Sequence, residues 1–273
     1  MKITFTLAVS FPVFYSFDMT VEQNYLWDDR APSFRLLAET ASLIAHKNHI
    51  VVDDTTRARW SDMGALMREI DTLYDDLHVT PTEIIERLKD YSEFQTLYPH
   101  LGPDFLEPEK REQIINTAAE LFRLGDVARL ISNPQKYAEN RYVEAQTTAY
   151  LVTDISSEAV IQQDKYAEDF IPSMEKFFIG VTFFDSLLDG FTDYRTGKTV
   201  VEPNLEYFNQ IRRIGRTSMR FTLKLVMHPT VATLAINMAK QRIHTRLVNG
   251  MNAYSTMNNI PHFFRHVLHR NPK

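Results

Sequence analysis

Two aspartate-rich segments, about a hundred residues apart, carry the side chains best suited to chemistry. The first runs from Met67 to Asp76 and the second from Phe183 to Arg195. In each segment carboxylates recur every fourth residue within a helical pattern, so they share one face of a helix. Ionised aspartates are costly to bury unless they are paired or bind a metal. Two such faces turned toward each other would form a site for a hard divalent cation, above all Mg²⁺, together with a diphosphate.

The spacing of the aspartates also has an ordinary explanation. The chain contains 18 aspartates in 273 residues, and random placement would give about one pair four residues apart. Three such pairs occur, namely Asp71/Asp75, Asp185/Asp189 and Asp189/Asp193. Phenylalanine, leucine, isoleucine and valine surround the second segment, whereas a solvated acidic face normally has lysine and glutamate neighbours. A solvent-exposed acidic face is therefore the alternative to a metal site for each segment.

Both segments resemble the motifs of squalene and phytoene synthases. Arg68, followed by Asp71 and then by Asp75 and Asp76, is similar to that family's first motif, in which an arginine stands three residues before an aspartate cluster. Asp189 and Asp193 match the two aspartates of the family's second motif. The sequence Tyr-Arg-Thr-Gly-Lys at 194–198 matches the basic tail of that motif. The resemblance covers about residues 33–225, and the large squalene-synthase-like bacterial terpene cyclases share the same two-motif arrangement.

The resemblance implies a class I isoprenoid synthase, which ionises a prenyl diphosphate with the help of up to three Mg²⁺ ions. The metal ligands that it implies are Asp71, Asp75, Asp76, Asp185, Asp189 and Asp193. The expected catalytic residues are Asp71, Asp75, Asp189, Asp193 and Arg68. The expected substrate-binding residues are Arg195, Lys198 and Tyr150.

Basic and aromatic side chains have separate expected roles. The guanidinium and ammonium groups of Arg68, Arg195 and Lys198 match phosphate oxygens, although a surface ion pair with a neighbouring acid is the alternative for each. An aromatic face can stabilise the carbocation that ionisation leaves behind. The candidates are Phe177, Phe184, Phe191, Tyr74 and Tyr150, with a plain core role as the alternative for each of them.

The chain departs from the family's motifs at three positions. Asp185 and Leu188 stand where the second motif has an asparagine and an arginine, and Tyr150 replaces a small residue in a weaker match at 149–152 to the family's middle helix. These departures favour a terpene synthase that cyclises the carbocation or eliminates a proton from it. A head-to-head prenyltransferase of the squalene or phytoene synthase type is the alternative. A helical binding or scaffold protein without catalysis is the third hypothesis.

Composition and periodicity predict a single all-α domain. Glycine provides only 8 of the 273 residues, under half of the usual share of roughly 7%, so few positions suit the hairpins of a β fold. We expect an isoprenoid-synthase-like helical bundle over residues 1–273, with a central cavity and an N-terminal arm at 1–32. The predicted helices cover 33–49, 60–78, 81–94, 108–131, 134–154, 157–169, 172–194, 204–226, 230–249 and 258–270.

The two acidic segments fall at the C-terminal ends of their predicted helices, 60–78 and 172–194. Neighbouring antiparallel helices would place these ends at opposite poles of the bundle. We therefore expect the two helices to run near-parallel or to be separated by others, with the carboxylates of both segments facing one cavity.

Several classes of protein are excluded or disfavoured by composition. Cysteine is absent, which excludes disulfides, thiolate catalysis and cysteine-ligated zinc. The formal net charge of −5 gives no basic excess that would indicate a nucleic-acid partner. No apolar run reaches the roughly 18 residues of a transmembrane helix. We expect a cytoplasmic protein whose partner is a prenyl diphosphate; peripheral membrane contact through the apolar N-terminal arm and a homodimer are both compatible with this interpretation.

Overall fold

The computed structural model describes residues 31–71, 73–74, 79–90, 97–102, 106–229 and 231–233, with side chains from Leu36 onward. Residues 1–30 of the expected N-terminal arm, Asp75 and Asp76, and the helix expected at 258–270 lie outside these ranges, as does nearly all of the helix expected at 230–249. The last two residues assigned to the arm, 31 and 32, belong to a helix instead. The described residues form helices, turns and irregular segments with no strand among them, which confirms the predicted all-α fold. Within the same ranges, no helix combines the length and apolar character that a membrane crossing requires.

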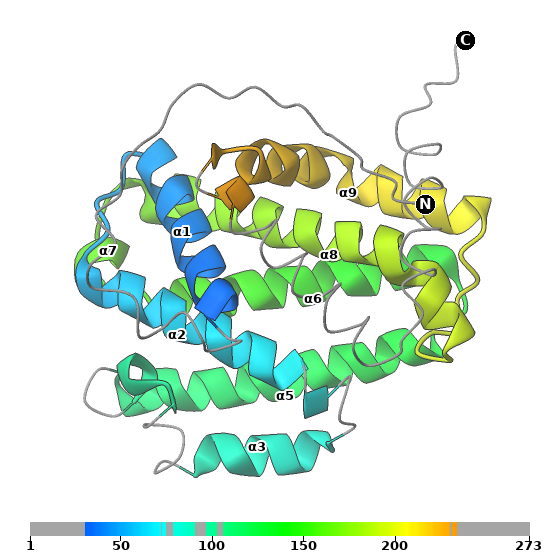
Figure 1. Ribbon diagram of the computed structural model, residues 1–273, viewed down its shortest axis with the longest axis horizontal. Helices are drawn as coiled ribbons and strands as arrows, with labels where there is room; N and C mark the ends of the chain where they lie inside the picture. The colour runs from blue at the N-terminus through cyan, green and yellow to red at the C-terminus, as the bar shows by residue number, and fades with distance from the viewer. Residues whose placement is uncertain are drawn as a thin grey trace, which may run out of the picture.

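Five of the described helices pack side by side in one layer, and two further helices pack on each other beside it. The elements are α1 (Ala31–Lys47), α2 (Asp54–Asp71), α3 (Pro81–Lys89), η3 (Pro99–Leu101), α5 (Pro108–Leu130), α6 (Pro134–Asp154), α7 (Glu158–Ile161), the π-helical turn η4 (Tyr166–Phe170), α8 (Ile171–Arg195) and α9 (Leu205–Val226). In the order α9, α8, α6, α5, α3, each helix packs against the next (Figure 1). Helices α1 and α2 pack on each other; α1 crosses the direction of the layer steeply, whereas α2 runs roughly along it (Figure 1).

Prolines and polar caps fix where several helices begin. Pro81, Pro108, Pro134 and Pro172 stand in the first turns of α3, α5, α6 and α8, where a missing N–H costs no hydrogen bond. At the start of α3, the Thr80 side chain accepts from the Glu83 amide while the Glu83 carboxylate accepts from the Thr80 amide. This reciprocal pair is the capping box predicted from the sequence.

Helix α2 begins six residues earlier than predicted, at Asp54 rather than at residue 60. The Asp53 carboxylate caps it by accepting from the Thr56 amide at 2.7 Å. Three hydrogen bonds to this carboxyl, from Ser157 and Thr56, outweigh the opposing effect of burial and lower its pKa. The side-chain oxygen of an aspartate directly before a polar first turn was the signal that the periodicity argument missed.

The single helix predicted at 157–169 is wrong. A short α7 is followed by a turn and then by η4. Gln163, in the turn, pairs with the backbone of Val51 in both directions: its Oε1 accepts from the Val51 amide at 2.8 Å, and its Nε2 donates to the Val51 carbonyl at 2.7 Å. The turn therefore exchanges local helical hydrogen bonds for a tertiary contact, which sequence periodicity does not report.

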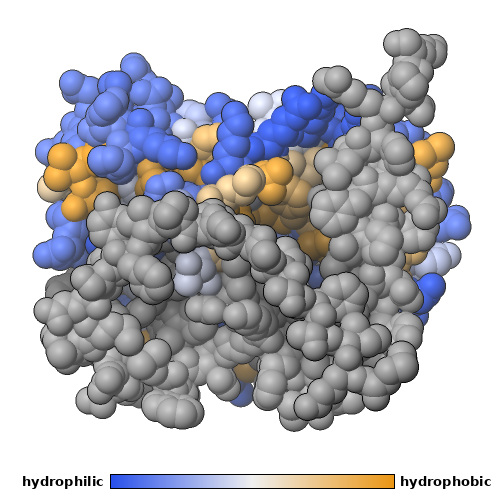
Figure 2. Space-filling model, turned by 45° about the horizontal axis from the view of Figure 1, so that its top comes forward, coloured by the Kyte–Doolittle hydropathy of each residue, from blue (hydrophilic) through white to orange (hydrophobic). Residues whose placement is uncertain are grey.

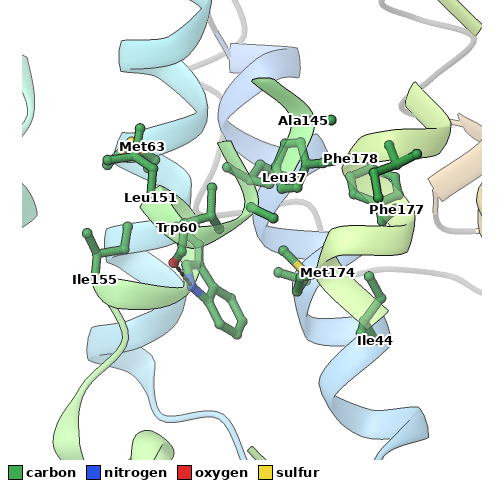
Figure 3. Packing of buried hydrophobic residues seen from close by; sticks show 14 of the residues in the cluster. Leu37, Ile44, Trp60, Met63, Ala145, Leu151, Ile155, Met174, Phe177 and Phe178 are labelled. Carbon is green, nitrogen blue, oxygen red and sulfur yellow. Dashed lines mark hydrogen bonds between the residues drawn. The ribbon is translucent and has the colours of Figure 1, made fainter. Parts of the chain in front are cut away.

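The core fills the space between α1, α2, α6 and α8. Trp60 is fully buried; its indole N–H donates to the Val152 carbonyl at 3.2 Å and its ring stacks on Phe170 at 5.6 Å. Figure 3 shows Trp60 beside Leu151 of α6 and Ile155, which directly follows that helix. Residues of α1 and α8 lie on the other side. Burying a large ring with its one polar group satisfied stabilises this junction of helices.

Helices α8 and α9 cross so closely that two glycines are required between them. A methyl group at Gly215 would lie 1.8 Å from the Phe183 ring, and one at Gly180 would lie 2.1 Å from the Thr222 hydroxyl. Thr222 fills this contact by donating to the Phe177 carbonyl at 3.0 Å. Because Phe183 is fully buried, its ring has no open space to move into.

We expect Gly215→Ala to destabilise the fold. Overpacking against the buried Phe183 ring should cost about 1–3 kcal/mol, which exceeds the roughly 1 kcal/mol gained in helix propensity. Chemical denaturation followed by circular dichroism measures the difference. Gly125→Ala on α5 is the matched control, because its nearest neighbour is the Tyr74 hydroxyl at 3.7 Å. An unchanged or raised stability for Gly215→Ala would contradict the close crossing.

Candidate functional site

A cavity of about 290 Å³ lies between α2, α5, α6 and α8. Both acidic segments reach it, the first through Asp71 and the second through Asp185 and Asp193. The other lining residues are Met67, Ile70, Tyr74, Ala118, Leu121, Phe122, Gly125, Ala128, Arg129, Tyr137, Arg141, Glu144, Thr148, Leu151, Ser186, Lys198 and Thr199. The structure therefore brings Asp71, Asp185 and Asp193 to one cavity. Asp189, which the sequence also predicted there, does not line it, and Asp75 lies outside the described residues.

The direction of the helices explains this meeting. Helices α2 and α8 both run from left to right in Figure 1, so their C-terminal ends point to the same end of the molecule. Helix α6 lies in the layer between α5 and α8 and presents one face, at every third or fourth residue, to the cavity. This is the near-parallel arrangement expected for two acidic helix ends that share one site.

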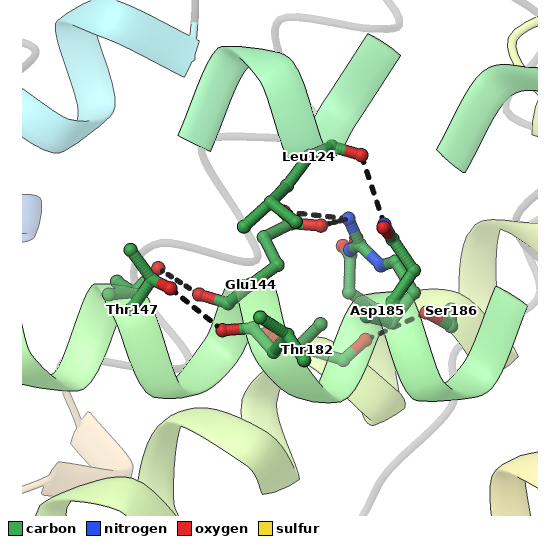
Figure 4. Close-up of polar contacts among 10 residues, drawn as sticks. Leu124, Glu144, Thr147, Thr182, Asp185 and Ser186 are labelled. Atoms are coloured by element: carbon green, nitrogen blue, oxygen red, sulfur yellow. Dashed lines mark hydrogen bonds and ion pairs between the residues drawn. The ribbon is translucent and has the colours of Figure 1, made fainter. Parts of the chain in front are cut away.

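Arg141, which the sequence analysis did not single out, links the acidic side chains that α6 and α8 bring to the cavity. Its side chain is only 17% exposed. It forms two hydrogen bonds to Glu144, at 2.6 and 2.8 Å, and an ion pair with Asp185 at 3.7 Å. Figure 4 shows Glu144 of α6 and Asp185 of α8 close together beneath the Leu124 carbonyl of α5. Burial opposes the charge on the guanidinium, but Glu144, Tyr137 and Asp185 outweigh it and raise its pKa.

Arg141 would have been detectable as a charged residue on the inward stripe of its helix. The positions of α6 that line the cavity are Tyr137, Arg141, Glu144, Thr148 and Leu151. Their spacing of four, three, four and three residues is that of one helical face. An arginine and a glutamate three residues apart usually indicate an exposed pair. Here the same pair lies on the side that packs against α5 and α8.

Two tyrosines support the backbone beside Arg141. The Tyr207 hydroxyl, from α9, donates to the Ser186 carbonyl at 2.7 Å, and the Tyr137 and Tyr207 rings lie 5.6 Å apart. Burial raises the pKa of Tyr207 and of Tyr137, so both hydroxyls stay neutral. A methyl group at Gly190 would come within 2.9 Å of the Tyr207 hydroxyl. Gly190, inside the second acidic segment, therefore leaves room for Tyr207, whose hydrogen bond holds α9 against α8.

The carboxylates of the second segment repel one another. Burial, together with the charges of Asp185 and Asp189, raises the pKa of Asp193 to about 6. Lys198 and Arg141 act in the opposite direction without cancelling the effect. Asp189 does not line the cavity, but it lies near enough for its charge to act on Asp193. The cluster therefore carries more negative charge than its own surroundings neutralise.

The first segment is described only in part, because Asp75 and Asp76 lie outside the described residues. Asp71 is 49% exposed and accepts from Arg68 at 2.6 Å. Tyr74 follows, with its hydroxyl bonded to Asp126 at 2.5 Å and the Arg129 guanidinium 4.4 Å from its ring centre. The aromatic face proposed for a carbocation at Tyr74 thus already contacts a cation of the protein.

Several predicted site residues lie away from the cavity. Arg68, Arg195, Tyr150 and the three candidate phenylalanines are absent from its lining. Tyr150 is 45% exposed, and Glu175 and burial raise the pKa of its hydroxyl, with the Glu175 hydrogen bond as the largest cause. Phe177 is buried in the core and Phe191 packs on Phe208. The aromatic rings that do line the cavity are those of Tyr74, Phe122 and Tyr137.

The carboxylates suit a cation that is shared with a ligand. Within the described ranges, no group of three or more acidic or histidine side chains is gathered closely enough to hold a metal ion by itself. Mg²⁺, however, commonly keeps several waters and binds through one or two carboxylates plus substrate phosphates. The mutual repulsion of Asp185, Asp189 and Asp193 is the feature that a bound divalent cation would relieve.

Comparisons with known proteins identify no relative: no family model, no curated protein and no solved structure matches the chain.

We expect Asp193→Asn to stabilise the metal-free protein near neutral pH but not at acidic pH. The pKa of Asp193 is about 6 in the folded chain and about 3.9 when unfolded. The folded state therefore binds this proton more tightly, and wild-type stability falls as pH rises from about 4 to about 6. Removing the charge should stabilise the protein by on the order of 2 kcal/mol at pH of about 7.5.

The same substitution should have little effect at pH of about 3, below both pKa values, where Asp193 is mostly protonated in the folded and the unfolded state. Urea titrations of both proteins in a chelator at the two pH values test this expectation. An equal difference in unfolding free energy at both pH values would show that Asp193 does not carry the proton.

Proposed function

We propose that the chain is a class I terpenoid synthase, which ionises a prenyl diphosphate in the cavity and then cyclises the carbocation or eliminates a proton from it. The observation that supports this most is that the cavity lining combines a charged cluster with apolar side chains. Arg141, Asp185, Asp193 and Lys198, whose charges act on one another, form a cluster that we call the charged end. Apolar side chains from α2, α5 and α6 line the cavity as well. A prenyl diphosphate has the same two parts, a charged head and a hydrocarbon tail.

The basic groups of the cavity would bind the diphosphate directly. Arg141 presents a planar guanidinium that is already oriented by Glu144 and Asp185, so little side-chain freedom is lost when it binds phosphate oxygens. Lys198 adds a compact charge from the tail of the second segment. Of the basic residues of the second motif's tail, Lys198 lines the cavity, whereas Arg195 is exposed and outside the lining.

The charge of the cavity accounts for a requirement for a divalent cation. Asp71, Glu144, Asp185 and Asp193 face three basic groups, Arg129, Arg141 and Lys198. A diphosphate added to this nearly balanced set introduces charge that these residues alone do not offset. When bound between Asp71 and the Asp185/Asp193 pair, Mg²⁺ would neutralise the charge that develops on the leaving diphosphate. Asp75, Asp76 and Asp189 remain proposed ligands on the resemblance alone.

The apolar wall would protect the carbocation from water. Met67 and Ile70 of α2, Leu121 and Phe122 of α5, and Leu151 of α6 are the apolar residues proposed to form this wall, and all five line the cavity. Excluding water prevents capture of the cation by hydroxide or solvent. Phe122 and Tyr137 are the rings of this wall whose faces are proposed to contact the cation.

The size of the cavity favours one substrate molecule. Its volume of about 290 Å³ lies at the lower end of the roughly 300–1,000 Å³ of pockets for drug-sized ligands. A head-to-head condensation must hold two prenyl chains at once. This comparison supports a single-substrate terpenoid synthase over a squalene- or phytoene-type transferase.

Incubation with C10, C15 and C20 prenyl diphosphates tests the proposal. We expect release of diphosphate and a hydrocarbon product, detected by gas chromatography with mass spectrometry, only when Mg²⁺ is present. Asp185→Asn keeps the shape of the side chain but removes a charged ligand and weakens the orientation of Arg141. Its rate should fall by roughly two to three powers of ten, which corresponds to a few kcal/mol in the transition state.

Asp164→Asn is the matched control, because Asp164 is an exposed aspartate in the turn after α7 and does not line the cavity. It should keep the wild-type rate. Equal rates for Asp185→Asn and wild type would remove the second segment from the mechanism. Calorimetric binding of diphosphate plus Mg²⁺ without any turnover would instead favour a non-catalytic binding protein, and no binding of either would favour a scaffold.

A further inference from the structure

Helix α9 exposes a face that is strongly basic in an otherwise acidic chain. Its exposed positions are Leu205, Glu206, Asn209, Arg212, Arg213, Arg216, Thr217, Arg220, Leu223, Lys224 and Met227, the last directly after the helix. Five of these eleven side chains are cationic and one is anionic. The whole chain, by contrast, has a formal net charge of −5. We call this set of positions the α9 face.

Among the described residues, the five cations of the α9 face have no acidic partner, since none of them forms an ion pair there. Exposed basic residues elsewhere are commonly paired, as Arg57 is with Glu39, Lys89 with Glu86 and Arg123 with Glu120. A row of like charges on one helix face repels itself. The uncompensated charge of α9 therefore attracts an anionic surface outside the protein.

Large apolar side chains accompany the charges. Leu205 is 65% exposed, Leu223 50% and Met227 73%. They stand on the same outward side as the arginines, at the two ends of the α9 face. The inward side of the helix is apolar in the ordinary way, with Tyr207, Ile211 and others buried against α8 and α6. The exposed leucines and methionine are thus not needed for packing within the described core.

The helix is placed where an extended surface can reach it. Helix α9 is the outermost member of the layer, at the edge opposite α3 (Figure 1). Figure 2 turns this edge forward and shows hydrophilic side chains along its upper rim with apolar ones among them. The helix has 22 residues, so it presents a rod about 33 Å long at 1.5 Å per residue.

We propose that the α9 face docks the protein on the surface of an anionic lipid bilayer. A basic helix lying in the plane of a bilayer gains about 1 kcal/mol per lysine or arginine near the surface. Leu205, Leu223 and Met227 would enter the boundary between headgroups and acyl chains, as the apolar residues of interfacial helices do. The inference does not depend on the proposed function, and it concerns a different segment from the N-terminal arm.

A lipid surface fits the α9 face better than a nucleic acid does. Proteins that bind single strands commonly stack bases on aromatic side chains along a basic groove. The α9 face has no aromatic residue, and it is the convex surface of one helix rather than a groove. Exposed leucine and methionine beside a row of arginines suit an anionic bilayer, in which charged headgroups cover a hydrocarbon interior.

Vesicle co-sedimentation of the full chain tests the proposal. We expect binding to phosphatidylcholine vesicles that contain about a quarter phosphatidylserine, little binding to pure phosphatidylcholine, and loss of most binding as NaCl rises from about 0.1 to 0.5 M. In the double variant Arg216→Glu with Arg220→Glu, the apparent partition coefficient should fall at least about thirtyfold, from two lost cations at about 1 kcal/mol each.

The matched control is Lys136→Glu with Lys165→Glu, which changes the net charge equally at exposed positions on α6 and before η4. It should bind as the wild type does, and all variants should keep the wild-type melting temperature. A second variant, Leu223→Gln with Met227→Gln, keeps the cations and should lose the binding that survives high salt.

Three results would overturn the proposal. Equal vesicle binding by wild type and the Arg216/Arg220 double variant would place any membrane contact elsewhere on the chain. Equal losses in the double variant and the lysine control would indicate a general effect of net charge. Salt-sensitive binding to single-stranded RNA without binding to anionic vesicles would assign the α9 face to a nucleic acid.

Discussion

The enclosed guanidinium of Arg141 requires acids on both sides, and this requirement fixes how the helices around the cavity meet. A buried cation without partners is far costlier than the pair itself is favourable. Glu144 on the same helix and Asp185 on α8 meet this need, so α6 and α8 are restricted to one register. The Tyr207 hydroxyl on the Ser186 carbonyl ties α9 to the same point. The charged end of the cavity is consequently also the place where three helices are fastened to one another.

Much of the fold could be predicted from the sequence because its signals are local. Proline in a first turn and the capping box at Thr80 mark helix starts through atoms only a few residues apart. The failures have the opposite character. Gln163 interrupts a helix to bind Val51, 112 residues away in the chain. The sequence around either residue does not predict its contact with the other, so periodicity alone favoured an unbroken helix over 157–169.

The candidate site likewise has parts that local sequence signals could predict and parts that they could not. Aspartates at helical spacing could be placed on common faces, and the structure brings Asp71, Asp185 and Asp193 to one cavity. Which aromatic rings would line that cavity depended on how far each helix is rotated about its axis. Of the candidate phenylalanines of α8, Phe177 is buried in the core, Phe184 packs against the core and Phe191 packs on Phe208. Arg141 was missed because an i,i+3 arginine–glutamate pair, taken alone, has the same sequence signature whether it faces solvent or α8. Only the stripe that it shares with Tyr137 and Leu151 indicates the inward side.

The intermediate position of α6 has a consequence for how such a site can change over time. The acids of α2 and α8 line the cavity together with one face of α6, which includes the small Thr148. The room inside the cavity is thus set partly by uncharged side chains of α6. A lineage could widen or narrow the chamber through single exchanges at such positions while every charged residue stays unchanged. Chemistry and capacity would then evolve as separate traits at separate positions.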